Sequence, residues 1–515
     1  MIKMIKTQKI PKILLGLLLL LFGLTHLLIG QNRLTENQGK NNEYKGILDE
    51  TENPSRPNVL IILADDMGYG DLHSYGGIAK TPNLDALASE GIKFTNCYAG
   101  APNCSPSRVG LLTGRIPARA GMYSYRPSGS VMHLPDNELT IAELLKPVGY
   151  QTAHFGKWHL GALPQDPELN QPQPHQKGFD YSLGTENNAE PSHLNPVNFI
   201  RNGSPLGEQK GYACQLVADE VDLWFENQYE EDQPFFLYVA FHEPHAKIAS
   251  PEKLIANYST YDEQSAEYFA NLENMDLATG RVLNALKARG LDNNTMVFFA
   301  SDNGPYRMGS QGELRGLKGE VYDGGIKVPG IFSYPGIFPG KREIETPIWF
   351  QDLLPTIAEL CGVKIPDDRE YDGVNLLPLL QGGYIQREKP MLWFFYRSSP
   401  EIAMRKGDYM LLARADDNIP RTHWVSDVDM SFIKNIQPEF YELYNVVEDA
   451  SQHLDLATSE LEKLEGMKKE LFLLLEEVKK EGPVWEGLPK YDAEKANHNK
   501  QKEFLRNQQV FLPKP

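Results

Sequence analysis

Cysteine is scarce in this sequence. There are four cysteines in 515 residues, too few for the set of disulfides that holds small secreted domains together. No two of them lie in the C-x-x-C arrangement typical of zinc sites. The four are Cys97, Cys104, Cys214 and Cys361.

Positive charge is also in short supply. The chain has 51 lysines and arginines against 69 aspartates and glutamates, and its formal net charge is −18. A protein that binds nucleic acid needs a basic stripe to neutralise the phosphates, so this balance argues against a nucleic-acid partner. An anionic substrate has to be captured by a local positive site, because the overall field does not attract it.

No internal repeat is evident, and the composition does not indicate disorder. Hydrophobic residues make up 41% of the chain and charged residues 23%, which is ordinary for a globular protein. The length suits one large domain with a smaller one.

The first 30 residues have the composition of an export signal. Four lysines precede the leucine-rich stretch 13–29, and polar residues follow from Gln31. This order predicts a signal peptide, with an uncleaved membrane anchor as the alternative. No cysteine lies near its end, so a lipoprotein anchor is not supported, and no stable membrane anchor is expected. We therefore expect an exported protein that is periplasmic or secreted.

The most informative stretch is 104–115, Cys-Ser-Pro-Ser-Arg-Val-Gly-Leu-Leu-Thr-Gly-Arg. Apolar residues follow the cysteine as in a buried helix start, and proline suits the first turn. Cys104 would then lie at the positive end of a helix, which favours an anion or a developing negative charge. Arg108 is one turn further on and can reach back toward it. The alternative is a buried structural cysteine.

Acidic residues follow two apolar runs that have the length of buried parallel strands. Asp65 and Asp66 come directly after one run, and Asp302 and Asn303 closely follow the other. Ligands of open α/β sheets gather at the carboxyl ends of strands, and adjacent buried acids are costly unless a cation compensates them. Carboxylate and amide oxygens suit Ca²⁺ or Mg²⁺. An N-capping aspartate or an Asp-Asn-Gly turn explains one acid but not the set.

Lysine and histidine side chains follow two further predicted strands. Lys157 and His159 alternate in the stretch Gly-Lys-Trp-His-Leu-Gly. In an extended chain both would point to the same side, which suits a sulfate group; a surface lysine beside a core histidine is the alternative. His242 and His245 follow the apolar run 234–240 and also have the pattern of site residues.

Residues 165–211 are rich in Pro, Asn, His and Gly and are expected to be loop-like. Insertions of this kind usually carry specificity. Four of their side chains are candidates for a sugar pocket, with solvated loop residues as the alternative for each: His175, Asn187, Asn188 and His193.

These motifs resemble those of a known family. Cys-x-Pro-x-Arg followed by Thr-Gly-Arg is similar to the signature of the type I, formylglycine-dependent sulfatases of the alkaline phosphatase superfamily, and Gly-Lys-Trp-His-Leu-Gly is similar to a second signature. Five motifs occur in family order between roughly residues 56 and 460, and the arylsulfatases and N-acetylgalactosamine-6-sulfatases look most similar. The resemblance implies an α/β fold with a large mixed central sheet flanked by helices and a smaller C-terminal α+β subdomain.

The resemblance also implies an active site. Cys104 would be oxidised to formylglycine (3-oxoalanine), whose hydrated form is the nucleophile, and the three cysteines left would allow at most one intramolecular disulfide. The cofactor would be one divalent cation, Ca²⁺, with Mg²⁺ as the alternative. The implied metal ligands are Asp65, Asp66, Cys104, Asp302 and Asn303, the implied catalytic residues are Cys104, Arg108, Lys157, His159, His245 and Lys318, and the implied substrate-binding residues are Lys157, His242, His245 and Lys318.

In the implied mechanism the metal, the two lysines and a histidine bind the sulfate oxygens, and sulfate leaves through a covalent intermediate. His245 or Lys318 would protonate the leaving oxygen, and His159 would act as base. The family usually has a proline where this chain has Lys247. The sulfate contact is therefore open between His242 and His245, and an alignment without gaps favours His245.

The predicted organisation has four parts: a signal peptide at 1–30, a linker at 31–55, a catalytic sulfatase domain at 56–385 and a C-terminal subdomain at 386–515. The subdomain is expected to contain strands at 391–395 and 409–412, a helix at 460–480 with a solvated face, and a polar tail over the last 30 residues.

The function that follows is hydrolysis of sulfate esters of sulfated poly- or oligosaccharides, with a formylglycine-generating maturation enzyme as a partner. One alternative is a phosphatase or phosphonate monoester hydrolase of the same superfamily. Those enzymes often use Thr or Ser as nucleophile and can hold two metals, and a second full ligand set is not apparent here. The other alternative is a glycan-binding protein that has lost catalysis, against which the intact basic residues argue.

Overall fold

The computed structural model describes residues 56–163, 169–415, 423, 425 and 427–486. The predicted signal peptide, the linker and most of the predicted C-terminal tail lie outside the described residues. Among the helices that are described, none is both long and apolar enough to cross a membrane.

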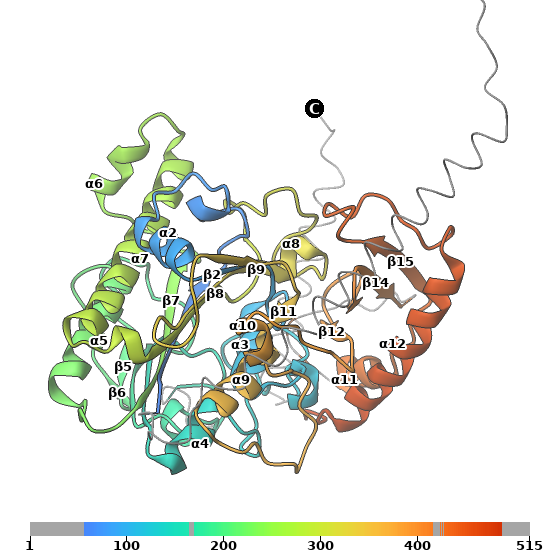
Figure 1. Cartoon of the computed structure of the whole chain (residues 1–515), viewed down its shortest axis with the longest axis horizontal. Coiled ribbons are helices and arrows are strands. Elements are labelled where there is room, and N and C mark those ends of the chain that lie inside the picture. Colours follow the sequence, from blue (N-terminus) through green and yellow to red (C-terminus); the bar gives the residue numbers. More distant parts are fainter. Residues whose placement is uncertain (1–55, 164–168, 416–422, 424, 426, 487–515) are drawn as a thin grey trace, which may run out of the picture. The chain divides into compact units, whose positions relative to one another are not determined.

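A large mixed sheet forms the centre of the described chain, which confirms the predicted fold class (Figure 1). Its strands run in the order β10-β2-β9-β8-β1-β7-β3-β4-β5-β6, and β11 pairs with β2. Strands β8, β1, β7, β3 and β4 are parallel, whereas β9 is antiparallel to β8 and β2. The strand bounds are β1 Asn58–Asp65, β2 Ile92–Tyr98, β3 Gln151–Lys157, β4 Tyr181–Thr185, β5 Ile200–Arg201, β6 Ser204–Pro205, β7 Phe235–Pro244, β8 Thr295–Ser301, β9 Lys327–Ser333, β10 Arg342–Ile344 and β11 Ile348–Trp349.

The central strand β1 is buried on both faces, as its continuous apolar run predicts. Val59, Ile61 and Leu63 point into one hydrophobic cluster, and the alternate residues Leu60 and Ile62 point into a second. A strand alternates its side chains between the two faces of a sheet, so one strand supports two cores.

Helices cover the two faces of the sheet, as Figure 1 shows. Helices α2, α5 and α7 contribute to the cluster on one face, and α3, α4 and α9 contribute to the cluster on the other. The helix bounds are α2 Pro82–Glu90, α3 Cys104–Thr113, α4 Ile141–Leu145, α5 Ala213–Asn227, α6 Glu252–Ile255, α7 Glu263–Ala288, α8 Asp323–Ile326, α9 Leu353–Leu360, α10 Leu377–Leu380, α11 Asp427–Asn435 and α12 Leu461–Glu481.

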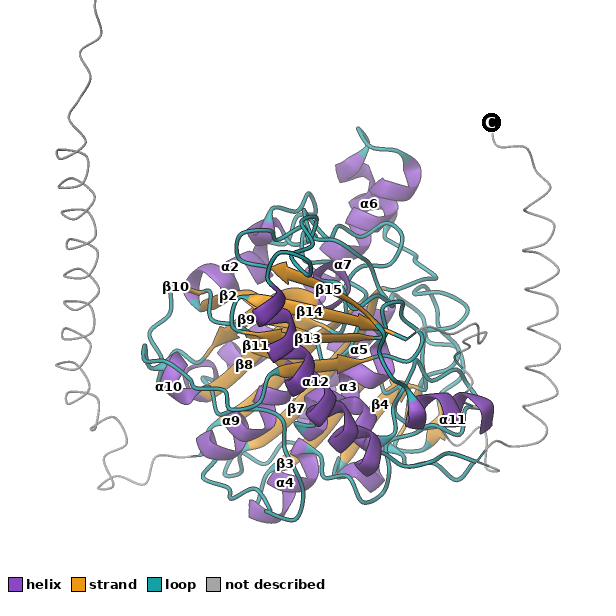
Figure 2. Ribbon diagram, turned by 90° about the vertical axis from the view of Figure 1, so that its right-hand side faces the viewer, coloured by secondary structure: helices purple, strands orange, loops and turns teal. Residues whose placement is uncertain are grey.

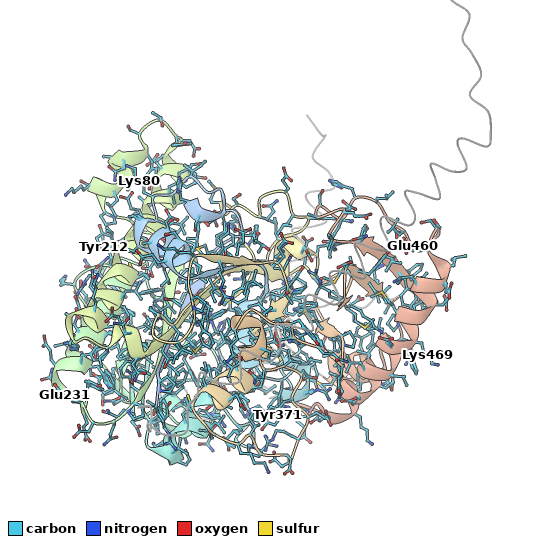
Figure 3. The ribbon with its side chains drawn as sticks, viewed as in Figure 1. Lys80, Tyr212, Glu231, Tyr371, Glu460 and Lys469 are labelled. Carbon is cyan, nitrogen blue, oxygen red and sulfur yellow. The ribbon has the colours of Figure 1, made fainter. Side chains whose placement is uncertain are left out.

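A second, smaller sheet follows, as expected of an α+β subdomain. It contains β12 (Met391–Phe394), β13 (Ile402–Lys406), β14 (Tyr409–Arg414) and β15 (Phe440–Asn445), all antiparallel. Helix α12 lies across this sheet (Figure 2) and buries leucines on one side. Lys469 lies on its outer side (Figure 3), in agreement with the predicted solvated face. The boundary predicted near residue 385 stays a prediction.

Several elements differ from the sequence-based expectation. The stretch 165–211 is not only loop, because β4 lies within it and pairs with β3 in the large sheet. Its sequence, Tyr-Ser-Leu-Gly-Thr, is too short and too polar to predict a buried strand. Helix α5 and strand β13 were also missed, since tertiary packing rather than local pattern stabilises them.

A buried ion network ties α12 to the part of the chain that carries the large sheet. Arg119, in the 3₁₀ helix η2 (Pro117–Ala120), is 2% exposed. Its guanidinium binds Asp372 at 3.0 Å and two residues of α12, Glu477 at 2.7 Å and Glu481 at 2.6 Å. Removing one partner of a buried ion pair leaves an uncompensated charge, which is costly.

We therefore expect Arg119→Leu to lower the free energy of unfolding by about 3–5 kcal/mol. Arg281→Leu is the matched control, because Arg281 pairs with Asp219 and Asp222 at the surface, where such pairs contribute at most about 1 kcal/mol. Denaturant unfolding of both variants tests the prediction, and equal losses would contradict it.

Candidate active site

The carboxyl ends of four neighbouring strands meet at one place. The strands lie in the order β8-β1-β7-β3. Asp65 ends β1, Lys157 ends β3, and His242 lies near the end of β7. Asp302 directly follows β8. Residues that are far apart in sequence are thus brought to one edge of the sheet, and the fifth contribution comes from the start of α3, at Cys104.

An acidic cluster lies at the centre of this edge. One ligand atom each of Asp65, Asp66, Cys104 and Asp302 lies within 4.8 Å of the others, and all four residues are buried. Cys104 Sγ is 3.9 Å from Asp66 Oδ1. The side-chain amide of Asn303 donates to the same oxygen at 2.9 Å. The five predicted metal ligands therefore lie together.

Each carboxylate of the cluster has its own cation. Arg108 binds Asp302 through Nε at 3.0 Å and Nη2 at 2.8 Å. Lys157 Nζ lies 2.6 Å from Asp65 Oδ2, and Lys318 Nζ lies 2.6 Å from an oxygen of the third carboxylate, Asp66. The guanidinium of Arg108, which lies one turn after Cys104 in α3, is thus fixed by Asp302, because a guanidinium prefers a carboxylate. Its expected approach to Cys104 stays a prediction.

The pKa values of two carboxyl groups in this crowded cluster shift in opposite directions. Burial and the neighbouring Asp65 raise the pKa of Asp302 to about 7, although Arg108 opposes the shift. Burial also acts against ionisation of Asp65, but Lys157 and His245 hold the pKa of its carboxyl well below its usual value. Like charges this close do not all ionise easily without a further cation.

The donor set fits a hard divalent cation. Asp65 Oδ1 and Asn303 Oδ1 are buried and have no hydrogen-bond partner among the described residues. Buried oxygens without a partner are costly, and a cation held by carboxylate and amide oxygens would satisfy them. The residues present therefore match Ca²⁺ or Mg²⁺ in ligand type.

Cys104 occupies the first turn of α3, as predicted. The side chain of Asn103 accepts a hydrogen bond from the Cys104 backbone N–H at 3.0 Å and so caps the helix. The thiol is completely buried, and burial raises its pKa to about 12, against the opposing effect of Lys157. The four cysteines are all free and buried in the structure.

Lys157 and His159 do not share an extended segment, contrary to expectation. Strand β3 ends at Lys157, and His159 has φ +59°, in the left-handed region. Gly156, before the lysine, has φ +102°, and a Cβ there would lie 1.9 Å from the carbonyl oxygen of Ala240. The motif therefore turns at the edge of the sheet and brings both side chains near the cluster.

The contacts of His159 define its tautomer. Its Nε2 lies 2.8 Å from the carbonyl oxygen of Arg126, which can only accept, so Nε2 carries the proton. Nδ1 is buried without a partner among the described residues. Burial and the neighbouring Lys157 hold the pKa of His159 well below its usual value. Both effects favour the neutral ring, in which the lone pair of Nδ1 is free.

The two histidines of β7 and its end have different surroundings. His245 Nε2 lies 3.4 Å from Asp66 Oδ2, at the cluster. His242 Nε2 is hydrogen-bonded to Thr185 Oγ1 at 2.8 Å, and its ring packs on Phe199. This geometry favours His245 as the sulfate contact, and the role of each stays a prediction.

The side chains of the site differ in their exposure. The side chains of Asp65, Lys157 and Arg108 are fully buried. Those of Lys318 and His245 are 10% and 16% exposed. Among the predicted site residues, Lys318 and His245 are thus the most exposed, and we call their position the mouth of the site.

Sequence reasoning missed Arg126, whose carbonyl oxygen positions His159. Its guanidinium binds Glu186 at 2.7 Å and Gln171 at 2.5 Å, and its backbone N–H donates to Ser105 Oγ at 3.0 Å. No periodic pattern surrounds this residue, so only the tertiary structure identifies it.

The four candidates for a sugar pocket lie in different surroundings. His175 is exposed, and Asn187 donates to the hydroxyl oxygen of Tyr125. Asn188 Oδ1 lies 3.4 Å from Lys157 Nζ, at the site. His193 is buried beside Asn271, so it is neither a solvated loop residue nor part of an open pocket.

Comparison with known proteins agrees with this geometry. The sequence pattern of the family described as sulfatase matches residues 57–363. The chain is 34% identical to N-acetylgalactosamine-6-sulfatase of Canis lupus familiaris over 69% of its own length and 71% of that protein. It is 36% identical to arylsulfatase A of Bos taurus over 69% of its own length and 74% of that protein.

The fold is also similar to that of a solved structure. The crystal structure of Ps i-CgsB in complex with k-i-k-neocarrahexaose has a TM-score of 0.73 and 25% identity, and the match covers 85% of this chain and 96% of that one. Together with the family match over more than half of the chain, these similarities show that the chain belongs to the sulfatase family and is a sulfuric ester hydrolase.

Proposed function

We propose that this sulfatase hydrolyses sulfate esters of sulfated carbohydrates, with formylglycine formed from Cys104 and with one bound divalent cation, Ca²⁺. The observation that carries the proposal is the buried cluster of three aspartates and Cys104 at the ends of the parallel strands. Three cations surround it, so the site combines oxygen ligands for a metal with positive groups for an anion.

The cation would be held by Asp65, Asp66, Asp302, Asn303 and residue 104. When bound, it supplies positive charge that polarises a sulfate group. The hydrated aldehyde at residue 104 supplies the nucleophilic oxygen.

The basic residues of the chain bind and orient the sulfate. Lys157 and Lys318 carry their ammonium groups at the edge of the cluster, where they attract sulfate oxygens and the charge that develops on them. Arg108 is held by Asp302 and by the carbonyl oxygen of Lys157, 2.7 Å from its Nη1. This fixed guanidinium orients residue 104 from within the same helix.

Three side chains are proposed for proton transfer. We assign His159 as the base on residue 104, because its buried Nδ1 has no hydrogen-bond partner among the described residues. His245 and Lys318 lie at the mouth, on the side from which the substrate enters. Either can donate a proton to the leaving alcohol oxygen.

A carbohydrate substrate is supported by the names of similar proteins. One relative is an N-acetylgalactosamine-6-sulfatase, and one similar structure contains a neocarrahexaose. We extend this to a sulfated galactose- or uronate-containing glycan. Export of the chain and maturation by a formylglycine-generating enzyme belong to the same proposal, and they rest on the sequence of residues 1–30 and on the motif at Cys104.

Assay of the reaction itself comes first. Protein produced together with a formylglycine-generating enzyme should release sulfate from at least one member of a panel of sulfated oligosaccharides. Phosphate and phosphonate monoesters serve as the comparison. A higher kcat/KM for these esters than for every sulfated glycan would contradict the proposal.

Cys104→Ala should lower kcat by at least about 10³-fold, because it removes the nucleophile. Cys214→Ala is the control, since Cys214 is equally buried but lies in the opposite core, and it should keep its activity. The Cys104 peptide of the active protein should react with a hydrazide reagent that detects aldehydes. Full turnover by Cys104→Ala would refute the assignment.

Ca²⁺ should stabilise the metal-free protein, because it neutralises the buried carboxylates. At a concentration about 100 times its Kd, the melting temperature should rise by about 3 °C or more. Asp66→Ala should abolish this shift, and Glu231→Ala, an exposed acid far along the surface (Figure 3), should retain it. An identical shift in Asp66→Ala would place the ion elsewhere.

A further inference from the structure

The mouth of the site carries an arginine that the reaction does not use. The loop after Asn303 begins with Gly304 and Pro305 and exposes Tyr306 and Arg307. The Tyr306 ring is 41% exposed. In an acidic chain, an exposed aromatic and an exposed arginine beside an anion-binding site require a physical explanation.

The base of this loop is fixed next to Lys318. The backbone N–H of Lys318 donates to the carbonyl oxygen of Pro305 at 3.0 Å. Further along, the backbone N–H of Ser310 donates to Asp71 Oδ1 at 2.9 Å. Tyr306 and Arg307 are therefore held between two anchored points, and their position relative to Lys318 is defined.

Tyr306 brings two positive charges together. Lys318 Nζ lies 5.6 Å from the centroid of the Tyr306 ring, and Arg307 Cζ lies 4.9 Å from the same centroid. Both are within the range of a cation–π interaction. The two cations therefore contact the same ring, which places them in the same part of the site.

The backbone of Arg307 has an energetically unfavourable conformation, and its guanidinium has no carboxylate partner among the described residues. Its φ is +57°, a left-handed conformation that a residue with a Cβ rarely adopts. Among the residues that the structure describes, no carboxylate forms an ion pair with its guanidinium. Arg281, by contrast, pairs with two aspartates at the surface. The guanidinium of Arg307 is therefore free to bind an anion that arrives with the substrate.

We propose that Arg307, placed by Tyr306 beside Lys318, binds a second anionic group of the substrate, a carboxylate or a sulfate on the sugar that carries the scissile sulfate or on its neighbour. The proposal rests on the proposed function, because it assumes that the scissile sulfate lies at Lys318. It narrows the substrate class to glycans with at least two negative groups close together. A guanidinium forms two parallel hydrogen bonds to either group, which gives selectivity as well as affinity.

The test measures binding, so that it does not depend on turnover. Cys104→Ala protein serves as the parent, and calorimetry gives Kd for two pairs of probes. The first pair is a uronate-linked N-acetylgalactosamine 6-sulfate disaccharide and its carboxyl-reduced form. The second pair is a disulfated and a monosulfated galactose disaccharide. In at least one pair the more anionic probe should bind about tenfold more tightly to the parent.

Adding Arg307→Ala should bring this ratio close to one, and Arg307→Lys should restore part of it. Arg289→Ala is the matched control, since Arg289 also stacks on an aromatic ring, that of Phe225, at 4.7 Å, but has no link to the site, and it should leave the ratio unchanged. An unchanged ratio in Arg307→Ala would overturn the proposal, as would a parent that shows no preference in either pair or binds none of the probes.

Sulfate release by the unsubstituted protein is measured in parallel and reports on the proposed function alone. A lost preference in Arg307→Ala together with an absence of sulfate release would refute the proposed reaction and keep the second anion site. Sulfate release together with an unchanged preference in Arg307→Ala would support the proposed reaction and refute the second anion site.

Discussion

The repulsion among three buried carboxylates is the constraint on which the site depends. Asp65, Asp66 and Asp302 are brought within a few ångströms of one another in a region that excludes water, where unbalanced charge is very costly. Three fixed cations, one for each carboxylate, balance this negative charge. In the proposed function, the positive groups that would bind a sulfate are the same groups that balance the acidic cluster, so metal binding and anion binding would both depend on one charge balance.

The fold supports this balance by its topology. Parallel strands need crossover connections, and the crossovers place sequence-distant segments side by side with the same orientation. Strand β1 lies in the middle, packs against both cores and delivers Asp65 at its end. Helix α12 is attached through a different ion network, around Arg119, which shares no residue with the site and serves stability. The small sheet contributes to the same hydrophobic core as the large sheet.

Much of this arrangement can be predicted from sequence. The apolar run before Asp65 predicts a buried strand because it leaves no polar face, and the acids at its end require compensation by a cation. The motif around Cys104 predicts a helix start, and the structure places the residue in the first turn of α3. The fold class was predicted from these patterns and from family resemblance. The left-handed turn at His159 was not predicted. The alternation of Lys157 and His159 is also the pattern of an extended strand, and nothing in it indicates that the backbone turns.

The features that sequence does not reveal are those made by backbone groups and by loops. Arg126 positions His159 through a carbonyl oxygen, a group that every residue has and no motif marks. Arg307 owes its place to a loop anchored at Pro305 and Ser310, so its nearness to Lys318 depends on contacts between segments and not on its neighbours in the chain.

The spread of the site along the chain has a consequence for how activity arises. Its residues run from Asp65 to Lys318, and the strands that carry them pair across long separations in sequence. Contacts of this kind form late, because a long segment of chain must be ordered first. Cys104 is completely enclosed once α3 is packed, yet before that stage its thiol is accessible while the carboxylates are still dispersed. If Cys104 is converted to formylglycine as we propose, this order allows the conversion to take place before the site that uses it is assembled.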